Sequence, residues 1–436
     1  MKRFIVMLIA AFVVGQATAQ TQLTLWHGFT AFLADVFEPM VDEFNAEFDE
    51  YHIEYRNLGT YPETMTAAIA AYRAGDAPNI VQMFEVGTAT MMGAGEAIVP
   101  VYELYERTGV DFDPDIYLAA IRGYYSLPDG RMMSMPFNSS TAITWINNDA
   151  FREAGLDPEN PPQTWAETRE AAQQIVDSGA APCGLSFAWP TWTQFEQFSA
   201  IHDVALASRA NGLEGLDAEL MIDSDLHVRH VQNLMDMMAE GSFTYGGRDA
   251  AGDALFPSGE CAILHGSSGL LARVTTEADF DWSVTFLPYY DDVEGAPLNS
   301  IIGGTSFWAM TAPGRTDEEY RGVAEFLNFI SRPDMVRHWH TTTGFLPIRH
   351  GVFEELQAEG YYEENPGLDI PYLQLTRTEP TENSRGLRLG NMPENRNIIQ
   401  EEFEAALQGE QTAQQAMDNA VQRGNAVLRA FERAQQ

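Results

Sequence analysis

The N-terminal part of the chain switches between the two-residue period of strands and the longer period of helices. Apolar positions from Phe32 to Phe48 keep helical spacing, and a second helix is opened by a Thr60-Tyr61-Pro62-Glu63 capping box and closed by Gly75. The predicted elements in order are strand 22–27, helix 32–48, strand 51–58, helix 61–74 and strand 79–84. This alternation predicts an α/β fold in which parallel strands are joined by right-handed helical crossovers.

Two residues of this region lie where ligands of such sheets bind, off the carboxyl ends of the strands. Glu85 directly follows the third predicted strand, and Tyr61 starts the second helix. Both are therefore candidates for a ligand-binding edge. The alternative roles are a helix-capping carboxylate for Glu85 and core packing for Tyr61.

A second domain is predicted after Pro136–Thr141, which we interpret as a crossing segment.

The aromatic stretch Phe187–Trp192 either lines a cleft or packs in a core. The loop Gly266–Gly269, between a strand and a helix, is a candidate anion-binding helix start. The paired glycines Gly303 and Gly304 let the backbone approach another group closely. The other predicted elements are strand 142–147, helices 165–178 and 195–206, strand 282–288 returning to the first domain, and helices 318–330, 394–407 and 413–434.

The stretch Arg385–Arg396 combines several anion-binding features. Two glycines bracket a short loop, after which Asn391 is expected to cap a helix that has Pro393 in its first turn and Glu394 three residues after the cap. A helix start offers free N–H groups and a positive dipole end, and the planar fork of Arg396 can reach a phosphate or carboxylate there. An ordinary capped surface helix with a solvated arginine is the alternative.

The length and the N-terminus bound the class of protein. A chain of 436 residues favours two domains over one. Residues 1–19 are typical of a secretory signal peptide: Lys2 and Arg3 precede a short apolar run and an Ala17-Thr18-Ala19 cleavage site. We expect cleavage after Ala19 and a mature, exported chain without a membrane span.

The mature chain is strongly acidic. Removing Lys2 and Arg3 from a formal charge of −38 leaves −40, and all remaining basic residues are arginine. Such a field repels nucleic acid and anionic membranes, so neither is expected as a partner. An anionic ligand must be held by local donors, against the field of the whole protein.

Cysteines and enzyme motifs add little chemistry. Cys183 and Cys261 permit one disulfide in an exported chain, and two buried thiols are the alternative. The sequence contains neither a G-x-S-x-G elbow nor a G-x-x-x-x-G-K-[ST] loop, and His227 and His230 lack partners with metal-ligand spacing. We therefore expect no catalytic residues, no metal and no cofactor. An exported phosphodiesterase or glycosidase is the competing enzyme hypothesis.

Four stretches together carry a family resemblance. The chain resembles the periplasmic sn-glycerol-3-phosphate-binding proteins of ABC importers, which are extracellular solute-binding proteins of the family 1 type. The resemblance covers the mature chain, with a weaker mark at Asp76-Ala77-Pro78 that many sugar-binding relatives share. The four stretches are Phe84–Met92, Pro136–Thr141, Ile301–Gly304 and Gly386–Pro393.

The resemblance implies two α/β lobes, each a mostly parallel sheet flanked by helices, joined by crossing strands. It implies that residues 20–138 and 282–333 form lobe 1, and that 139–281 and 334–436 form lobe 2. The ligand-binding residues carried over by motif are Tyr61, Glu85, Ser140, Ser267, Gly304, Phe345 and Arg396. Phe345 departs from the pattern, because the family has Gly-Tyr-Leu-Pro where this chain has Gly344-Phe345-Leu346-Pro347.

The implied function is capture of sn-glycerol 3-phosphate by a monomeric periplasmic receptor, with delivery to the permease and ATPase of an ABC importer. Arg396, Ser267 and the Gly304 N–H are donors suited to a phosphate, and Glu85 is an acceptor suited to glycerol hydroxyls. Because a carboxylate and a phosphate repel, we expect Glu85 and Arg396 at opposite ends of the ligand. The alternative ligands are a glycerophosphodiester such as glycerophosphocholine, whose choline would face Trp189 or Trp192, and an oligosaccharide.

Overall fold

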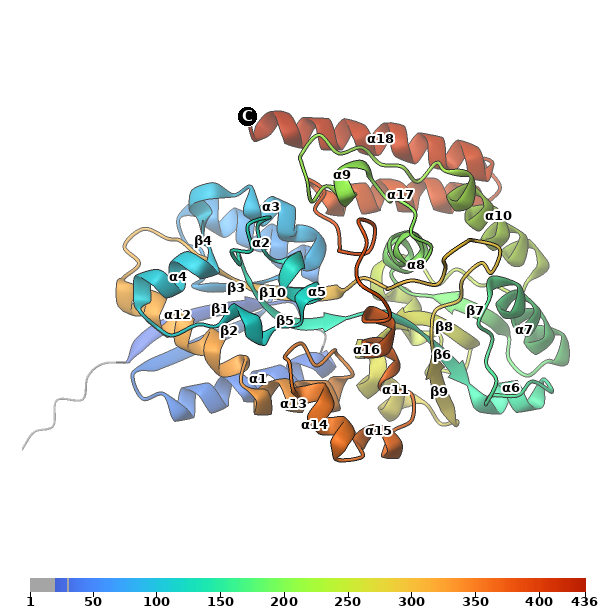
Figure 1. Ribbon diagram of the computed structural model, residues 1–436, viewed down its shortest axis with the longest axis horizontal. Helices are drawn as coiled ribbons and strands as arrows, with labels where there is room; N and C mark the ends of the chain where they lie inside the picture. The colour runs from blue at the N-terminus through green and yellow to red at the C-terminus, as the bar shows by residue number, and fades with distance from the viewer. Residues whose placement is uncertain (1–19, 30) are drawn as a thin grey trace, which may run out of the picture.

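The computed structural model describes residues 20–29 and 31–436, so the expected signal peptide and its cleavage site lie outside the described residues. Two sheets lie side by side, each with helices around it, and form two lobes (Figure 1). We call the elements around the sheet that contains β1 the first lobe and those around the other sheet the second lobe. The two-lobed α/β architecture agrees with the expectation from the sequence.

The first sheet has the strand order β2-β1-β3-β10-β4, and β5 also pairs with β10. Its strands are β1 (Thr21–His27), β2 (Tyr51–Asn57), β3 (Ile80–Phe84), β4 (Ile98–Val99), β5 (Met135–Ser140) and β10 (Gly303–Met310). The pairs of β1 with β2 and β3 are parallel, as predicted. Strand β10 is antiparallel to β3, β4 and β5, so the other five strands run in one direction and β10 alone runs against them.

The second sheet has the order β7-β8-β6-β9. Its strands are β6 (Ala142–Asn147), β7 (Cys183–Phe187), β8 (Cys261–Ser267) and β9 (Trp282–Thr285). Only β7 and β8 are parallel, while β6 is antiparallel to β8 and to β9. Strands β7, β8 and β9 therefore run in one direction and β6 alone runs against them, so the expectation of a mostly parallel sheet is confirmed in both lobes.

The crossing segment predicted at Pro136–Thr141 is confirmed, since only Thr141 separates β5 in one sheet from β6 in the other. The predicted return at residue 282 is wrong. Strand β9 pairs with β6, with Trp282 opposite Asn147, and Val284 is buried with Trp145. The chain re-enters the first sheet only at β10.

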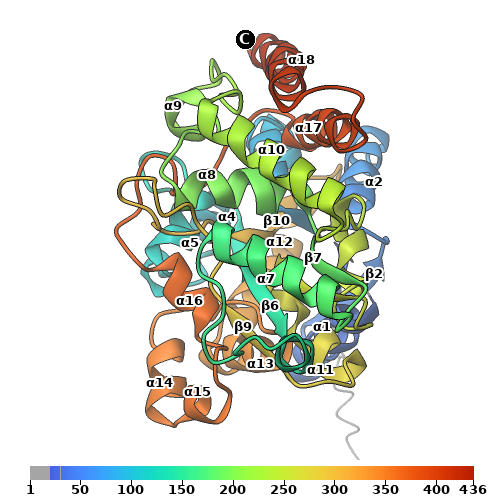
Figure 2. The same ribbon diagram turned by 90° about the vertical axis from the view of Figure 1, so that its right-hand side faces the viewer.

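The boundary at residue 334 is also wrong. Helix α13 packs against α1 and α12 of the first lobe, and its Trp339 lies 5.4 Å from Phe29 and 4.8 Å from Phe137 between ring centroids. Apolar residues from Met335 to Leu356 share the core of the first lobe. The last two helices, α17 and α18, pack against α10 of the second lobe (Figure 2).

Most of the long helices begin and end at the residues that the sequence marks. Thr60 and Glu63 form the predicted capping box, and α2 ends at left-handed Gly75. The same device opens α18 at Thr412. The helices are α1 (Ala31–Glu47), α2 (Tyr61–Ala74), α3 (Thr88–Met92), α4 (Val101–Thr108), α5 (Ala119–Tyr124), α6 (Asn148–Glu153), α7 (Trp165–Ser178), α8 (Gln197–Ile201), α9 (Ser208–Asn211), α10 (Asp225–Glu240), α11 (Leu271–Glu277), α12 (Asp317–Ile330), α13 (Pro333–Thr343), α14 (Val352–Ala358), α15 (Tyr361–Glu364), α16 (Ile370–Leu375), α17 (Met392–Leu407) and α18 (Ala413–Ala434).

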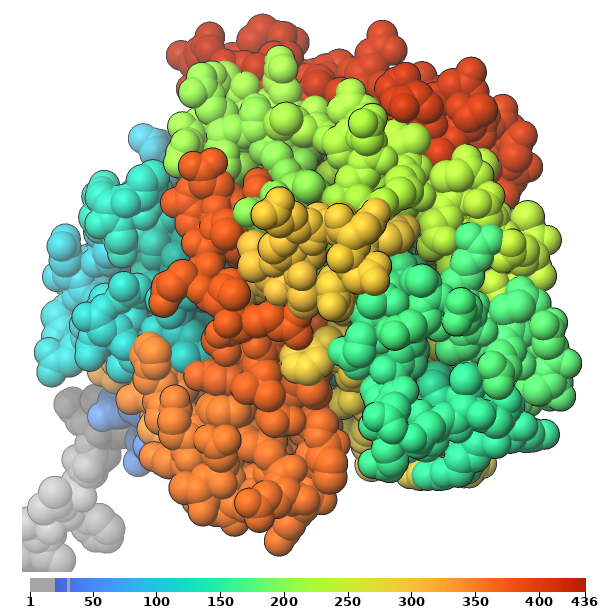
Figure 3. Space-filling model, turned by 45° about the vertical axis from the view of Figure 1, so that its right-hand side comes forward, coloured from blue at the N-terminus to red at the C-terminus, as the bar shows by residue number. Residues whose placement is uncertain are grey.

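The chain between α14 and α17 lies on the boundary between the lobes. Figure 3 shows it in orange to red, running between the cyan surface of the first lobe and the green surface of the second. None of the helices within the described ranges combines the length and apolar composition needed to cross a bilayer.

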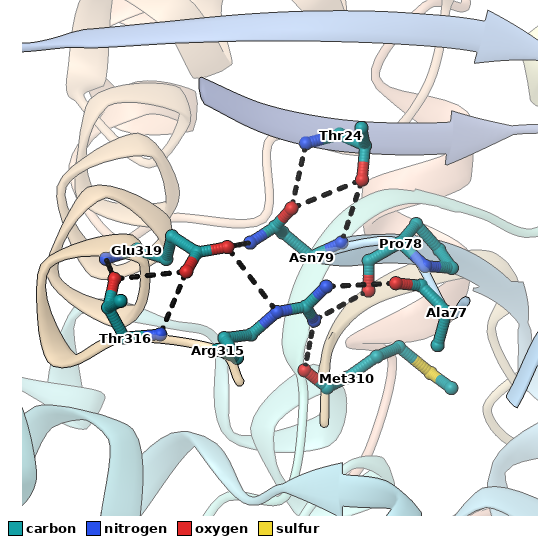
Figure 4. Close-up of polar contacts among 8 residues, drawn as sticks. All are labelled: Thr24, Ala77, Pro78, Asn79, Met310, Arg315, Thr316 and Glu319. Carbon is teal, nitrogen blue, oxygen red and sulfur yellow. Dashed lines mark hydrogen bonds and ion pairs between the residues drawn. The ribbon is translucent and has the colours of Figure 1, made fainter. Parts of the chain in front are cut away.

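A polar network fixes the amino end of β3 at the far end of the first sheet from Glu85 (Figure 4). The buried guanidinium of Arg315 donates to the carbonyls of Ala77 and Pro78, each at 2.8 Å. Asn79 accepts from the Thr24 N–H at 2.9 Å, which aligns β3 with β1. The Asp76-Ala77-Pro78 segment therefore has a structural role, because the carbonyls of Ala77 and Pro78 bind Arg315, which lies just before α12.

The predicted disulfide is confirmed. Cys183 and Cys261 are directly opposite each other on β7 and β8, with Cα atoms 4.4 Å apart, and are bonded. The bond joins neighbouring strands of one lobe and closes a loop of 78 residues.

Reducing this disulfide should lower the free energy of unfolding by roughly 2–4 kcal/mol, because the unfolded chain regains the freedom of a long loop. Urea unfolding with and without a thiol reductant measures this difference. The double variant Cys183→Ala/Cys261→Ala is the matched control, since reductant should leave its unfolding curve unchanged. An unchanged curve for the wild type would mean that strand pairing alone fixes this part of the second lobe.

Four histidines are buried together in the second lobe. His230 contacts the Gln194 oxygen at 3.2 Å, and the Gln194 amide nitrogen lies 3.4 Å from His265. His227 bonds the Ser199 hydroxyl at 2.8 Å, and His202 accepts from a backbone N–H at 2.9 Å. Burial lowers the pKa of His202 to about 4 and that of His227 and His265 to about 3, and it lowers the pKa of His230 well below the usual value. These rings are neutral parts of the core.

Candidate functional site

Arg396 lies at the junction of the two lobes and is 7% exposed. It projects from the second turn of α17. Its Nε and Nη2 donate to the two carboxylate oxygens of Glu196, each at 2.7 Å, and Nη2 also donates to Glu85 Oε1 at 2.7 Å. Glu196 belongs to the second lobe, in the turn before α8, whereas Glu85 follows β3 in the first lobe. One guanidinium thus connects carboxylates of both lobes.

The three side chains are almost completely withdrawn from water, and their charges set one another's ionisation. Burial raises the pKa of Glu85, and Glu196 raises it further, while the Arg396 charge opposes both. For Arg396, burial by itself would lower the pKa, but the two carboxylates raise it overall. With both carboxylates ionised, the group carries one net negative charge. It therefore favours a further cation or a hydrogen-bond donor over a free anion, unless one carboxylate leaves Arg396.

This geometry corrects two expectations. Glu85 and Arg396 were expected at opposite ends of a ligand, but they contact each other directly, because Glu196 leaves the second N–H of Nη2 free to pair across the lobes. Asn391 was expected to cap α17 with its side chain, but it makes no such bond and adopts φ of 50°. A capping side chain reaches the first-turn N–H groups from an extended backbone, whereas the backbone of Asn391 is left-handed and only its carbonyl accepts, from the Glu394 N–H at 3.1 Å.

Tyr61 lies beside this cluster. Its hydroxyl accepts from the Asn138 amide at 3.1 Å, and burial raises its pKa above the usual value. Its ring is stacked against Trp189 of the second lobe, with centroids 6.5 Å apart and planes at 27°. An aromatic contact between the lobes therefore accompanies the ion pair.

The two tryptophans of the aromatic stretch have different surroundings. Trp189 is half-buried, and its φ of 52° is unusual for a bulky residue. The backbone N–H of Trp189 donates to the Asp249 carbonyl at 2.7 Å, and this bond stabilises the unusual backbone conformation. Trp192 is buried against Gly303, where a Cβ would come within 2.6 Å of the indole. Trp189 thus faces the junction, whereas Trp192 packs in it.

Ser140 and Gly304 lie on the paired strands β5 and β10. Gly304 has φ of 100°, and a Cβ there would collide with the Asn138 carbonyl, so no other residue fits. Ser140 is opposite Gly303 and is buried. Because Asn138 contacts Tyr61 through its side chain and Gly304 through its backbone, it links these strands to the Arg396 cluster.

Ser267 and Phe345 lie on the other side of the crossing strands. The Ser267 hydroxyl accepts from the Gly269 N–H at 3.1 Å and caps the single turn before α11. The Phe345 ring is buried between Gly269 and Trp339, whose ring centroid is 5.6 Å away. The Leu346 N–H donates to the Ser139 carbonyl at 2.7 Å, which joins this group to β5.

The seven predicted residues therefore form two neighbouring groups. Tyr61, Glu85 and Arg396 surround the ion pairs, while the others surround the crossing strands: Ser140, Ser267, Gly304 and Phe345. Sequence reasoning missed Glu196 and Asn138. Asn138 lies inside the Pro136–Thr141 motif, from which only Ser140 was predicted to bind the ligand. Glu196 carried no signal, because carboxylates are abundant throughout this chain.

A groove of about 480 Å³ opens near the second group, between helices of both lobes. Phe32 of α1 faces it from the first lobe, and Trp282 and Thr275 face it from the second. Its lining has no charged side chain. Within residues 20–29 and 31–436 no group of three or more His, Cys, Asp or Glu side chains is arranged to hold a metal ion.

Residues 39–368 match the family model described as bacterial extracellular solute-binding protein. Similar relatives include the sn-glycerol-3-phosphate-binding periplasmic proteins UgpB of Rhizobium meliloti, 45% identical over 95% of both chains, and of Brucella abortus, 45% identical over 97% of both. The protein of the same name from Yersinia pseudotuberculosis is 42% identical over 96% of this chain and 94% of its own length.

Two solved structures share the fold. UgpB from Mycobacterium tuberculosis in complex with glycerophosphocholine is 20% identical and has a TM-score of 0.79, covering 94% of this chain and 99% of that one. The GacH receptor of Streptomyces glaucescens, studied unliganded and with acarbose, is 17% identical with a TM-score of 0.76, covering 95% and 100%.

Proposed function

Because the chain belongs to the bacterial extracellular solute-binding proteins, we propose that it is a periplasmic receptor that captures sn-glycerol 3-phosphate between its lobes. The relatives that carry this name match nearly the whole chain at 42–45% identity. The receptor delivers its ligand to the permease subunits of an ABC importer, driven by the importer's ATPase, and acts as a monomer without catalysing a reaction.

The observation that carries the proposal is the buried guanidinium at the junction of the lobes. Glu196 holds Arg396 by two parallel bonds, which fixes the direction of the remaining Nη2 contact. Glu85 occupies that contact in this structure. A ligand phosphate takes the place of the Glu85 carboxylate on Nη2, and Glu85 is then released to accept from a ligand hydroxyl.

The remaining proposed contacts follow from the two groups of residues. Ser140, Ser267 and the Gly304 N–H donate hydrogen bonds, and Tyr61 with Phe345 supplies apolar walls. Ligand contacts to both lobes stabilise the closed state over the open one, which couples binding to recognition by the permease.

A glycerophosphodiester is the second candidate ligand, and the net negative charge of the Arg396 cluster favours it. A diester phosphate carries one charge, whereas a phosphomonoester carries close to two at neutral pH and meets stronger repulsion from Glu85 and Glu196. The half-buried Trp189 offers a face to a choline cation. A neutral oligosaccharide is a weaker candidate, because it has no anionic group to replace Glu85 on the Arg396 guanidinium.

Calorimetric titration separates these ligands. We expect stoichiometric binding of sn-glycerol 3-phosphate or glycerophosphocholine, and no binding of maltose or uncharged glycerol at the same concentrations. A chromogenic phosphodiester should not be hydrolysed. Tight binding of maltose without binding of either phosphate ester would contradict the proposal, and turnover of the diester would instead support an enzyme.

A further inference from the structure

Two buried tyrosine hydroxyls near the Arg396 cluster have no hydrogen-bond partner. Tyr124 and Tyr125 are 1% and 0% exposed, and neither hydroxyl contacts a donor or acceptor anywhere in the described chain. Leaving a buried polar group unpaired is unfavourable, and most such groups in folded proteins are paired. Other buried polar atoms of the described chain also lack a partner, but these two are adjacent in sequence and close to the charged cluster, which points to a partner supplied from outside the chain.

The position of Tyr124 ties it to the junction of the lobes. It ends α5, which Figure 1 shows in the middle of the molecule beside the chain that leads to α17. Gly386 of that chain packs on the Tyr124 ring so closely that no Cβ fits. Arg388 donates to the Tyr124 carbonyl at 3.0 Å and to the Ser126 carbonyl at 2.6 Å. The loop that precedes Arg396 therefore holds Tyr124 from the second lobe.

The electrostatics agree with this placement. Burial raises the pKa of both hydroxyls, and the Glu85 charge raises them further. Glu196 and Arg396 also act on Tyr124, and Tyr61 acts on Tyr125. The two rings are in contact, with centroids 5.1 Å apart and planes at 60°.

We propose that the hydroxyls of Tyr124 and Tyr125 recognise the glycerol hydroxyls of the ligand. This inference rests on the proposed function and assigns the polyol half of the site to residues that no motif singled out. A tyrosine hydroxyl both donates and accepts, as a ligand hydroxyl does, so each pair satisfies both members. Glu85 cannot serve all of these hydroxyls, because an ionised carboxylate accepts hydrogen bonds but donates none to the hydroxyl oxygens.

The test compares sn-glycerol 3-phosphate with propyl phosphate, which keeps the phosphate and the carbon chain but lacks both hydroxyls. Wild-type protein should prefer the glycerol ester. Tyr124→Phe and Tyr125→Phe should each weaken binding of the glycerol ester on the order of 2- to 10-fold and leave propyl phosphate unaffected. Neither change should lower the melting temperature of the unliganded protein, because each removes an unpaired buried hydroxyl.

Tyr117→Phe is the matched control. Tyr117 is equally buried in the first lobe, but its hydroxyl already bonds Ser331 at 2.6 Å. This variant should lose stability and keep the wild-type preference between the two phosphates.

The outcomes are distinguishable. If the wild type binds neither sn-glycerol 3-phosphate nor glycerophosphocholine, the proposed function fails and the inference with it. If the wild type binds sn-glycerol 3-phosphate but does not prefer it over propyl phosphate, only the inference fails, whether or not the variants fold. The inference also fails if both Phe variants keep the full preference, because an ordered water would then be the only partner of these hydroxyls.

Discussion

Replacing Arg396 with alanine should reduce affinity for the phosphate ester on the order of 10- to 150-fold and also destabilise the unliganded protein. The loss of affinity follows from one charge-assisted pair worth roughly 1.5–3 kcal/mol. The loss of stability follows because Glu85 and Glu196 remain buried without a cation, which costs about 3–5 kcal/mol. Titration calorimetry and urea unfolding measure the two effects separately.

Two further variants separate the ligand contact from the structural role. Arg396→Lys should recover only part of the affinity, because an ammonium cannot make the two parallel bonds to Glu196. The triple variant Arg396→Met/Glu85→Gln/Glu196→Gln removes all three charges and should regain much of the stability without regaining affinity. If Arg396→Ala binds every phosphate ester as the wild type does, the phosphate is held elsewhere and the centre of the proposed site is wrong.

Acid should destabilise this protein between about pH 6.5 and pH 5, before most of its carboxylates are protonated. The pKa of each of the four clustered histidines is lower in the folded protein than the value of about 6.5 in the unfolded chain. The unfolded state therefore takes up protons first as the pH falls, and stability is lost progressively below about pH 6.5 until the folded pKa values of about 3–4 are reached. At pH 5 the loss is about 2 kcal/mol for each of the three histidines with a folded pKa of about 3–4, or about 6 kcal/mol together. The free energy of unfolding of natural domains is about 5–15 kcal/mol, so the loss caused by the histidines is comparable with the total stability.

Surface charge acts in the opposite direction, since protonating carboxylates relieves the repulsion within an acidic chain. Urea unfolding should be measured from pH 8 to pH 4.5 in about 1 M sodium chloride. The salt screens the repulsion between surface carboxylates, so the remaining pH dependence reports the buried groups. His227→Gln should flatten the pH dependence, whereas His338→Gln on the surface is the matched control. A stability that rises steadily towards pH 5 would show that protonation of the acidic surface outweighs the histidine cluster.

The sequence predicted those features that depend on neighbouring residues. The Thr60–Glu63 capping box and the stop at Gly75 involve contacts within a few positions, so their residue types alone indicate them. The three parallel strands β1, β2 and β3 follow from the alternation of periods. The Asn391 cap was predicted on the same basis and is wrong, because the backbone at Asn391 is left-handed rather than extended.

Features set by distant contacts were harder to predict. Strand β9 has a pattern that suits either sheet, and only its pairing with β6 assigns it to the second. Arg396 and Glu85 are 311 positions apart, and Glu196 is 200 positions from Arg396. Each was visible as a charged residue, but in a chain with 63 acidic residues nothing local distinguishes the two carboxylates that share one guanidinium.

The position of β10 in the first sheet determines when that sheet can form. Strand β10 lies between β3 and β4 and also pairs with β5, so the sheet stays open until Met310 has been synthesised. Strands β1, β2 and β3 are synthesised more than 200 residues before β10. The first sheet therefore depends on contacts between distant parts of the sequence, and such topologies fold slowly. For a chain destined for the periplasm, the first sheet therefore cannot be completed until β10 has crossed the membrane.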